Sequence, residues 1–489
     1  MTLDLAVNEV VLLAAVLVVV GVLSTGVADR LRVPSLLLLL GIGMLVADDG
    51  LALVSFDDAE LAQSVAIVAL VIILFDGGLS ASPTHLREVA VPAGLLASVG
   101  VALTACVVAG ASVLILDVPA TTAWLIGAVV SSTDAAAVLS VLRDSPVPRR
   151  LGALLETESG LNDPVAVLLT VGVLETWAGD ATALGWIGFG ARQLGGGALV
   201  GVVVGLGGAW LATHARLNSA AMIAVLGSGL AGLAYGAASW LGGSGLLAVY
   251  LAGLLLGRNL SRHRHALATV HEGFAVTAQM ALFLMLGLLV FPSDVIDVAG
   301  DGALIALVLA LVARPLSVVA VLAWFRPRPN EVALVAWAGL RGAVPIVLAT
   351  FPLTAGHPDA ALVFDLVFFA VLLSVAVQGV TIGPLARRLG LASEPAPAKA
   401  TLVALDTVAA DVIEFELDDS ALVVGQRLRD VPMPAGMRVS VLVRGNRSVV
   451  PDGDTVLAAG DLLIVVTDAS AGAPGLLDRW VATAPRPLL

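Results

Sequence analysis

The chain has 489 residues, of which 59% are hydrophobic and 13% charged, and its mean hydropathy is +1.01. Soluble globular domains average about 45–50% apolar and about 25% charged residues, so this composition excludes an ordinary soluble protein and indicates a membrane protein. The formal net charge of −13 argues against nucleic-acid binding. The single cysteine, Cys106, excludes an intramolecular disulfide and a cysteine-based metal cluster.

Apolar runs recur up to about residue 388, many of them near 20 residues, which suffices to cross a bilayer core of roughly 30 Å as a helix. They lack the alternation of apolar and polar residues that β-barrel strands show. The first run follows Asp4 and Glu9 without a basic segment, so we expect a retained span and not a cleaved signal. We expect about thirteen transmembrane helices, at residues 8–27, 34–48, 61–79, 89–116, 119–142, 151–176, 184–213, 219–241, 242–257, 272–292, 298–325, 330–353 and 360–386.

The loops between these runs predict an orientation. Arginines follow the odd-numbered spans, as at Arg30, Arg143 and Arg258, whereas acidic residues such as Asp48 and Asp294 follow the even-numbered ones. Since positive loops stay in the cytoplasm, the N-terminus is expected outside and the C-terminus inside.

The composition of the sequence changes after Arg388. Residues 389–400 are Pro- and Ala-rich and predict a linker, and residues 401–470 hold short β-rich runs separated by turns such as "PDGD". We therefore expect a transmembrane domain over 1–388, a small cytoplasmic α+β domain over 401–470, and a tail over 471–489. No strand–GxGxxG–helix unit is present, so a dinucleotide-binding fold is not indicated.

Charged and amide side chains interrupt the apolar spans. A charge near the bilayer centre costs roughly 2.5–3.5 kcal/mol on insertion scales, so such residues usually face the protein interior and have a function. Asp163 lies about 18 Å along its span at 1.5 Å per residue, near the midplane, and Arg341 lies at a similar depth. The interrupting residues are Asp76, Asp134, Glu156, Glu158, Asn162, Asp163 and Arg341.

Helical phase divides the polar residues of the sixth span. Ser159 and Asp163 share one face, and Glu158 and Asn162 form another. The first face could hold an ion while the second anchors the helix. Glu158 is then the expected partner of Arg341, because an unpaired guanidinium at this depth is costly.

Two spans contain breaks. "SSTD" ends at Asp134, and "RGAVP" begins at Arg341 and contains a Gly and a Pro that weaken the helical hydrogen bonds. The two spans run in opposite directions, and broken helices at corresponding places in inverted repeats indicate a transporter's midplane site. Asp76, near the cytoplasmic end of its span, either lines an entry funnel or extends to water. Gln279 and His271 are expected to be satisfied structural groups.

Oxygen donors suit hard cations, and a buried carboxylate such as Asp163 can bind either a proton or an alkali cation. Competition at one site that opens alternately to each side predicts cation/proton exchange by a secondary transporter, with no enzyme activity. A sodium/proton antiporter with the same site remains an alternative. A gated cation channel ranks lower because no TVGYG-like filter occurs. An intramembrane protease, based on Ser244 in "GGSG", ranks lowest.

Four motifs stand in this order along the chain: "LFDGGL", "SSTDAAAV", "ESGLNDPVAV" and "GLRGAVPIVLA". Together they resemble the monovalent cation:proton antiporter family, in its NhaP-type branch, and the resemblance covers residues 8–388. The resemblance implies a six-helix core bundle that moves like an elevator beside a dimerisation domain, within a homodimer of the inner membrane. It makes Asp163 the central carboxylate, with Ser159, Asp134 and Thr133 as supporting ligands. Asn162, in the "ND" pair, is associated with electroneutral exchange. Ala135 stands where many sodium-exchanging members have Pro, which favours potassium.

Residues 425–466 resemble a TrkA-C (RCK_C) domain, which implies dimerisation and regulation of potassium transport. Some members bind cyclic dinucleotides there. A domain that acts as a dimer clamp without a ligand is the alternative. No other cofactor is expected.

Overall fold

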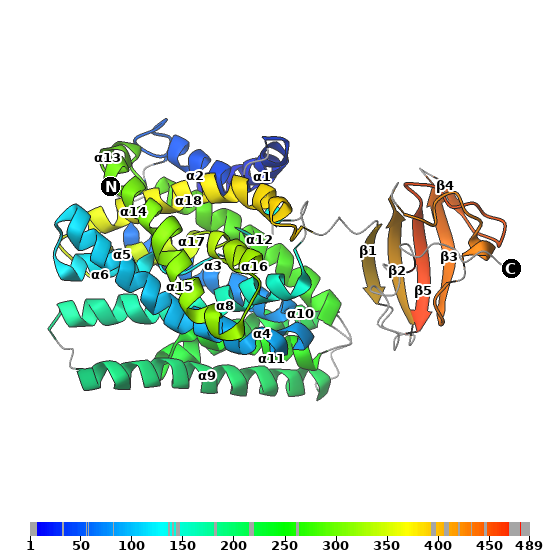
Figure 1. Ribbon diagram of the computed structural model, residues 1–489, viewed down its shortest axis with the longest axis horizontal. Coiled ribbons are helices and arrows are strands. Elements are labelled where there is room, and N and C mark those ends of the chain that lie inside the picture. Colours follow the sequence, from blue (N-terminus) through cyan, green and yellow to red (C-terminus); the bar gives the residue numbers. More distant parts are fainter. Residues whose placement is uncertain are drawn as a thin grey trace. The chain divides into compact units, whose positions relative to one another are not determined.

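The computed structural model describes residues 7–31, 34–54, 56, 58–81, 83–134, 137–138, 141–142, 147–179, 183–214, 220–260, 264–392, 398–404, 410–418, 421–431, 433–444, 447–468 and 480. The chain divides into two compact units, a helical one up to Ala392 and a strand-rich one after it (Figure 1). Ala135 and the expected tail, apart from Trp480, lie outside the described residues.

The first half of the helical unit ends with the helix that carries the candidate carboxylate. A π-helical segment, η1, joins α4 and α5 into one long helix. The bounds are α1 Val7–Leu31, α2 Ser35–Val46, α3 Ala59–Ser80, α4 Pro83–Leu95, η1 Leu96–Gly100, α5 Val101–Leu116, α6 Ala120–Val129 and α8 Arg149–Trp177.

The second half also contains a helix with a π-helical segment, η3, which joins α14 to α15. The bounds are α9 Ala183–His214, α10 Ala220–Trp240, α11 Gly245–Asn259, α12 Arg264–Leu288, α13 Pro292–Asp297, α14 Ala299–Val308, η3 Leu309–Ala313, α15 Arg314–Leu322, the 3-10 turn η4 Ala323–Phe325, α16 Pro329–Trp337, α17 Ala343–Thr354 and α18 Ala360–Arg388.

Each of the thirteen expected ranges overlaps a helix or a helix pair of the structure. Among the described residues, seven helices are long and apolar enough to cross a membrane, and five more apolar helices are shorter. Helix α8 is not among the seven, although it has 29 residues. Its charged residues lower its hydropathy. The chain is thus a helical membrane protein, while the number of crossings and the orientation remain predictions.

Close helix packing positions the interior of this unit. Helix α11 packs against α3, where a Cβ on Gly78 would collide with the Tyr250 carbonyl and one on Gly253 with the Phe75 carbonyl. Small residues at such contacts let helix backbones approach closely in membranes. Large buried side chains, including Phe75, Phe283 and Phe368, fill the remaining space.

The strand-rich unit is a five-stranded sheet in the order β1-β2-β5-β3-β4, with every neighbouring pair antiparallel. Ile413, Phe415, Leu463 and Val465 form its fully buried centre. Within the described part of 398–468, the only helical element is the 3-10 turn η5 Leu428–Asp430, so the α part of the expected α+β fold is not seen there. The strands are β1 Ala398–Ala404, β2 Ala410–Leu417, β3 Met437–Arg444, β4 Arg447–Val449 and β5 Leu462–Asp468, so β1 begins inside the range expected to be a linker.

Candidate functional site

Two helices of the helical unit are interrupted, and their unwound segments meet. Helix α6 ends at Val129 and the chain is helical again at Ala137, while residues 338–342 separate α16 from α17. The Asp134 N–H donates to the Leu340 carbonyl over 2.8 Å. The interruptions at "SSTD" and "RGAVP" therefore belong to one structure, a crossing of two broken helices.

Glycine is required at one point of this crossing. A Cβ built on Gly342 would collide with the carboxylate of Asp134. Asp134 is half-buried, and its Oδ1 accepts the Ala137 N–H at 3.1 Å, which caps the helix that begins there. A carboxylate at a helix N-terminus is favourable because the helix dipole is positive there.

Helix α8 lies against the unwound segment through Thr133. The Ser159 hydroxyl donates to the Thr133 carbonyl at 2.7 Å, and the Asn162 amide donates to the Thr133 hydroxyl at 2.6 Å. Thus residues from both expected faces of α8 contact the same residue. Asn162 therefore joins the site and does not belong to the separate anchoring face expected for it.

Asp163 is 4% exposed, and its Oδ1 has no hydrogen-bond partner among the described residues. Pro164 follows inside α8 and cannot donate the helical hydrogen bond to the Gly160 carbonyl. A buried carboxylate oxygen without a donor is costly, so it is expected to take a proton or a cation. A buried carboxylate that takes either a proton or a cation has the chemistry that cation/proton exchange requires.

Glu158 pairs with Arg314 and not with Arg341, so the expected Glu158–Arg341 pair is wrong. Arg314 Nη1 and Nη2 lie 2.5 Å and 2.9 Å from Glu158 Oε1 and Oε2, and both residues are almost fully buried. Arg314 is the first residue of α15, directly after the π-helical segment η3. Depth alone cannot choose between two arginines, and Arg314 was not among the residues expected at the site. Its signal is an Arg-Pro step in the middle of an apolar run.

Arg341 instead holds the two unwound segments together. Its Nη1 donates to the carbonyls of Ser131, at 2.9 Å, and Ser132, at 2.5 Å. These carbonyls follow the end of α6, where helical donors are missing. Its own N–H donates to the Ser374 hydroxyl, at 3.2 Å, which links the crossing to α18.

The remaining candidates lie away from the crossing. Asp76, on α3, is half-buried, and its Oδ1 has no partner within the described part of the chain. His271 is buried on α12, with Nδ1 3.0 Å from the Leu267 carbonyl and Nε2 3.3 Å from the Ser228 hydroxyl, as expected of a structural group. Gln279, on the same helix, is half-buried. Ser244 caps α11, because its hydroxyl accepts the Leu247 N–H at 3.3 Å.

Two crossed broken helices beside a buried carboxylate define an ion-exchanging membrane transporter. The profile of the family described as sodium/hydrogen exchanger, transmembrane, matches residues 14–388, and that of the TrkA-C domain matches residues 412–473. The chain therefore belongs to the sodium/hydrogen exchanger family, and it is a transporter and not an enzyme. Both resemblances found in the sequence are confirmed.

Several relatives are similar over most of their length. The chain is 38% identical over 474 residues to the K(+)/H(+) antiporter NhaP2 of Shewanella baltica (strain OS223), covering 94% of this chain and 81% of that protein. It is 35% identical to the K(+)/H(+) antiporter NhaP of Alkalimonas amylolytica, with the same coverage. It is 28% identical over 407 residues to the Na(+)/H(+) antiporter NhaH of Halobacillus dabanensis, covering 78% of this chain and 99% of that protein.

A solved structure has the same fold. The sodium proton antiporter MjNhaP1 from Methanocaldococcus jannaschii at pH 8 superposes with a TM-score of 0.69 at 22% identity, covering 78% of this chain and 99% of that chain. At this identity the likeness concerns the helical fold alone.

Proposed function

We propose that the chain exchanges K⁺ for H⁺ across the cytoplasmic membrane without net charge movement. The observation that carries this proposal is Asp163, whose buried Oδ1 lacks a hydrogen-bond donor among the described residues beside the crossing. The names of the NhaP2 and NhaP relatives support potassium as the cation.

The charge balance follows from one titrating carboxylate. Asp163 is negative when empty and neutral when it holds either a proton or a monovalent cation, so both loaded states cross the membrane with the same charge. Asn162 stands where a second carboxylate would change this balance, and its amide is bound to Thr133. Thr133, Ser159 and Asp134 supply the other oxygens, which suit a hard cation.

Sodium is the second candidate for the transported cation. The NhaH relative is named as a Na(+)/H(+) antiporter, and oxygen ligands alone do not separate the two ions. Selectivity depends on the size of the ligand cage. A direct comparison of the two ions is therefore part of the test.

The surrounding architecture forms part of the proposal. We infer thirteen spans with the N-terminus outside, a transmembrane domain over 1–388, a linker that ends before β1 at Ala398, a cytoplasmic domain from β1 to residue 470, and a tail over 471–489. The alternating arginines support the orientation. The match of the transmembrane family profile to residues 14–388 supports the first boundary. The family resemblance supports a homodimer, and Asp76, near one end of α3, lies where a funnel residue would be expected.

For the strand-rich domain we propose regulation of transport. The TrkA-C match at residues 412–473 supports this role. Two mechanisms of regulation are open, and they predict different results when the chain is tested in proteoliposomes. If a cyclic dinucleotide is the ligand, its addition changes the exchange rate; if the domain is a dimer clamp, the nucleotide has no effect and deletion of 401–489 lowers dimer stability.

The exchange proposal is tested in proteoliposomes with a preset pH gradient. K⁺ or Na⁺ is added to wild type and to Asp163→Asn, each with and without a valinomycin clamp. We expect K⁺ to collapse the gradient in wild type whether or not the clamp is present, and the variant to be inactive. Normal exchange by Asp163→Asn, or a failure of both cations to move protons, would overturn the proposal.

A further inference from the structure

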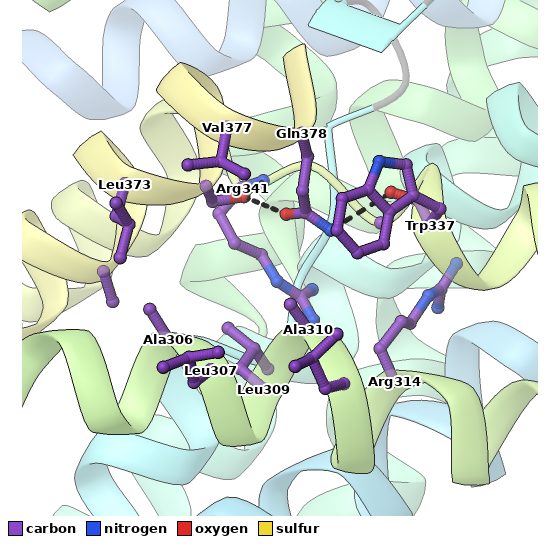
Figure 2. A pocket seen from close by; sticks show the side chains of 14 residues that line it. Ala306, Leu307, Leu309, Ala310, Arg314, Trp337, Arg341, Leu373, Val377 and Gln378 are labelled. Atoms are coloured by element: carbon purple, nitrogen blue, oxygen red, sulfur yellow. Dashed lines mark hydrogen bonds between the residues drawn. The ribbon is translucent and has the colours of Figure 1, made fainter. Parts of the chain in front are cut away.

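Two hollows lie along the long helix that α14, η3 and α15 form. The first, of about 180 Å³ between this helix and α18, has an almost wholly apolar wall (Figure 2). The unpaired N–H groups of Arg314 and Arg341 beside it are themselves buried, so none of them reaches a ligand. The second hollow, of about 340 Å³, lies toward the other end of α15 and includes an exposed arginine, Arg326. The exchange mechanism uses neither space, and of the two only the second can bind a charged group.

Arg326 is the charged group of this second hollow, which we call the Arg326 groove. Its guanidinium makes no hydrogen bond or ion pair with any residue that the structure describes. Its backbone is left-handed, with φ of 49° and ψ of 48°, at the end of η4, where glycine is the ordinary residue. An arginine here costs backbone energy that no contact of its side chain offsets within the described chain. The groove is lined by Val319, Ala323, Arg326, Pro327, Pro329 and Val332.

The groove lies where a membrane-spanning helix ends. The apolar helix at 299–325 is long enough to cross a bilayer, and its last two residues, Trp324 and Phe325, are 87% and 37% exposed. Aromatic side chains gather at the level of the lipid headgroups, and arginines flank spans on the cytoplasmic side. Arg326 is therefore at the level of the headgroups, whereas Val319, seven residues earlier, lies about 10 Å deeper at 1.5 Å per residue.

An exposed apolar stripe leads from the hydrocarbon into the groove. Val312, Leu316 and Val319 are 50%, 51% and 52% exposed, and Ala323 follows them at the groove. Steps of three or four residues keep side chains on one side of a helix, and the exposure shows that this side is turned outward. From Val312 to Ala323 the stripe is about 16 Å long, which is close to half of a bilayer core of roughly 30 Å. The stripe thus matches one acyl chain in one leaflet.

The charge around the groove is positive. Arg326 and Arg328 outnumber Glu331, whose carboxylate accepts the Arg328 N–H at 3.2 Å at the start of α16. The end of α18, which carries two further arginines, lies close because Asn330 of α16 donates to the Leu389 carbonyl at 3.1 Å. An anion at the headgroup level is therefore favoured over a cation or a neutral group.

We propose that the Arg326 groove binds the phosphate of an anionic glycerophospholipid, with one acyl chain lying along the stripe from Val312 to Ala323. The groove holds about eleven groups of the size of a water molecule, taken as roughly 30 Å³ each, which is enough for a phosphate and its glycerol carbons. The Arg326 guanidinium can bind the phosphate with two parallel hydrogen bonds. The orientation proposed above puts the groove in the cytoplasmic leaflet, which carries anionic lipids.

The test counts bound lipid by native mass spectrometry of the full chain after delipidation in detergent, so it does not depend on ion exchange. Phosphatidylglycerol is the anionic probe, phosphatidylcholine the zwitterionic one, and glycerol 3-phosphate a soluble headgroup without chains. Arg326→Gln removes the charge, with Arg258→Gln at the exposed end of α11 as the matched control. Ala323→Phe fills the groove, and Ala320→Phe is its control at an exposed position of α15 that does not line it.

We expect one tightly held phosphatidylglycerol per chain in wild type and in both controls. Binding should be at least tenfold weaker in Arg326→Gln and Ala323→Phe, and phosphatidylcholine should bind wild type at least fivefold more weakly. Far-UV circular dichroism and the lipid-free unfolding temperature show whether each variant is folded.

Three results would overturn the proposal. Phosphatidylglycerol binding that Arg326→Gln and Ala323→Phe leave unchanged would place the lipid elsewhere. Glycerol 3-phosphate that displaces the lipid at equal concentration would show that the acyl chain contributes nothing. A groove covered by a second copy of the chain would bind no phosphatidylglycerol and would give dimers that Ala323→Phe dissociates.

Discussion

Arg314 and Glu158 form a two-point ion pair between α15 and α8, with Nη1–Oε1 and Nη2–Oε2 distances of 2.5 Å and 2.9 Å. Arg314 Nη2 also lies 3.4 Å from the Val335 carbonyl of α16. Through these contacts Arg314 ties α8, the helix of Asp163, to α15 and α16. A fixed framework around Asp163 suits the role proposed for it, in which the carboxylate binds a cation and a proton in turn.

Removing one member of this pair should destabilise the protein strongly. A buried charge left without its partner typically costs about 3–5 kcal/mol. Arg314→Gln and Glu158→Gln should therefore each lower the unfolding temperature, and the double variant should lose less than the sum of the two. The measurement is the thermal unfolding temperature in detergent. The rate of K⁺/H⁺ exchange in proteoliposomes is a second readout.

Arg341→Gln is the matched control for this cycle. Its coupling with Glu158→Gln should be much smaller, since Arg341 binds the carbonyls of Ser131 and Ser132. A larger coupling with Arg341 than with Arg314 would contradict the pairing seen in the structure.

Much of the helical framework could be predicted from the sequence. The predicted ranges 61–79, 151–176 and 360–386 agree within two residues with α3, α8 and α18. The two breaks were also predictable from "SSTD" at 131–134 and "RGAVP" at 341–345, because Gly, Pro and a run of hydroxyl residues locally weaken helical bonding, although the second break lies at 338–342 in the structure. These features depend on local chemistry, which the sequence carries directly.

The partner of Glu158 could not be predicted in the same way. It is 156 positions away, and two arginines lie at comparable depths. The π-helical segment that precedes Arg314 rotates the following residues, and no motif in "LALVA" announces it. Likewise, only the packing of α8 brings Asn162 and Ser159 to the same threonine. The roles of these residues in ion binding remain predictions.

Gly342→Ala should abolish exchange. The added Cβ would collide with the Asp134 carboxylate, and the backbone on both sides belongs to the unwound segments and cannot move freely. We expect at least a tenfold loss of K⁺-driven proton flux in proteoliposomes. Gly300→Ala is the matched control, because a Cβ on Gly300 meets no atom within 4 Å. Equal flux from the two variants would show that the close approach is unimportant.

His357 should make the stability of the helical unit depend on pH. It lies in the loop between α17 and α18, is 4% exposed, and contacts the Trp177 ring at 4.9 Å between centroids. Burial lowers the pKa of His357, although the nearby Asp359 carboxylate opposes this shift. Its Nδ1 accepts the Asp359 N–H at 3.2 Å, which requires an unprotonated Nδ1.

The sign of the effect follows from proton linkage. Below the ordinary histidine pKa of about 6.5, the unfolded chain binds a proton that the folded chain takes up only at lower pH. Stability should therefore fall as pH drops below about 6.5 and level off once pH is below the folded pKa of His357. His357→Asn keeps an acceptor for the Asp359 N–H and removes the titration. Unfolding temperatures between pH 8 and pH 5 should separate this variant from wild type, whereas His214→Asn at the exposed end of α9 should behave as wild type.

Asn162→Asp should convert electroneutral exchange into electrogenic exchange. The new carboxylate can still accept a hydrogen bond from the Thr133 hydroxyl, which at present accepts one from the Asn162 amide, so the contact is retained with the donor reversed. The site then has a second negative charge beside Asp163. Loading with two protons on one side and one cation on the other gives states that differ by one charge.

The measurement is K⁺-driven proton flux with and without the valinomycin clamp. The proton flux of wild type should be the same with and without the clamp, whereas the flux of Asn162→Asp should differ severalfold between the two conditions. Asn162→Ala separates the charge from the lost contact, because it removes the bond to Thr133 without adding a carboxylate. If Asn162→Asp exchanges ions at a rate that the clamp does not change, then Asn162 does not set the stoichiometry, and the charge balance depends on Asp134 or on another group.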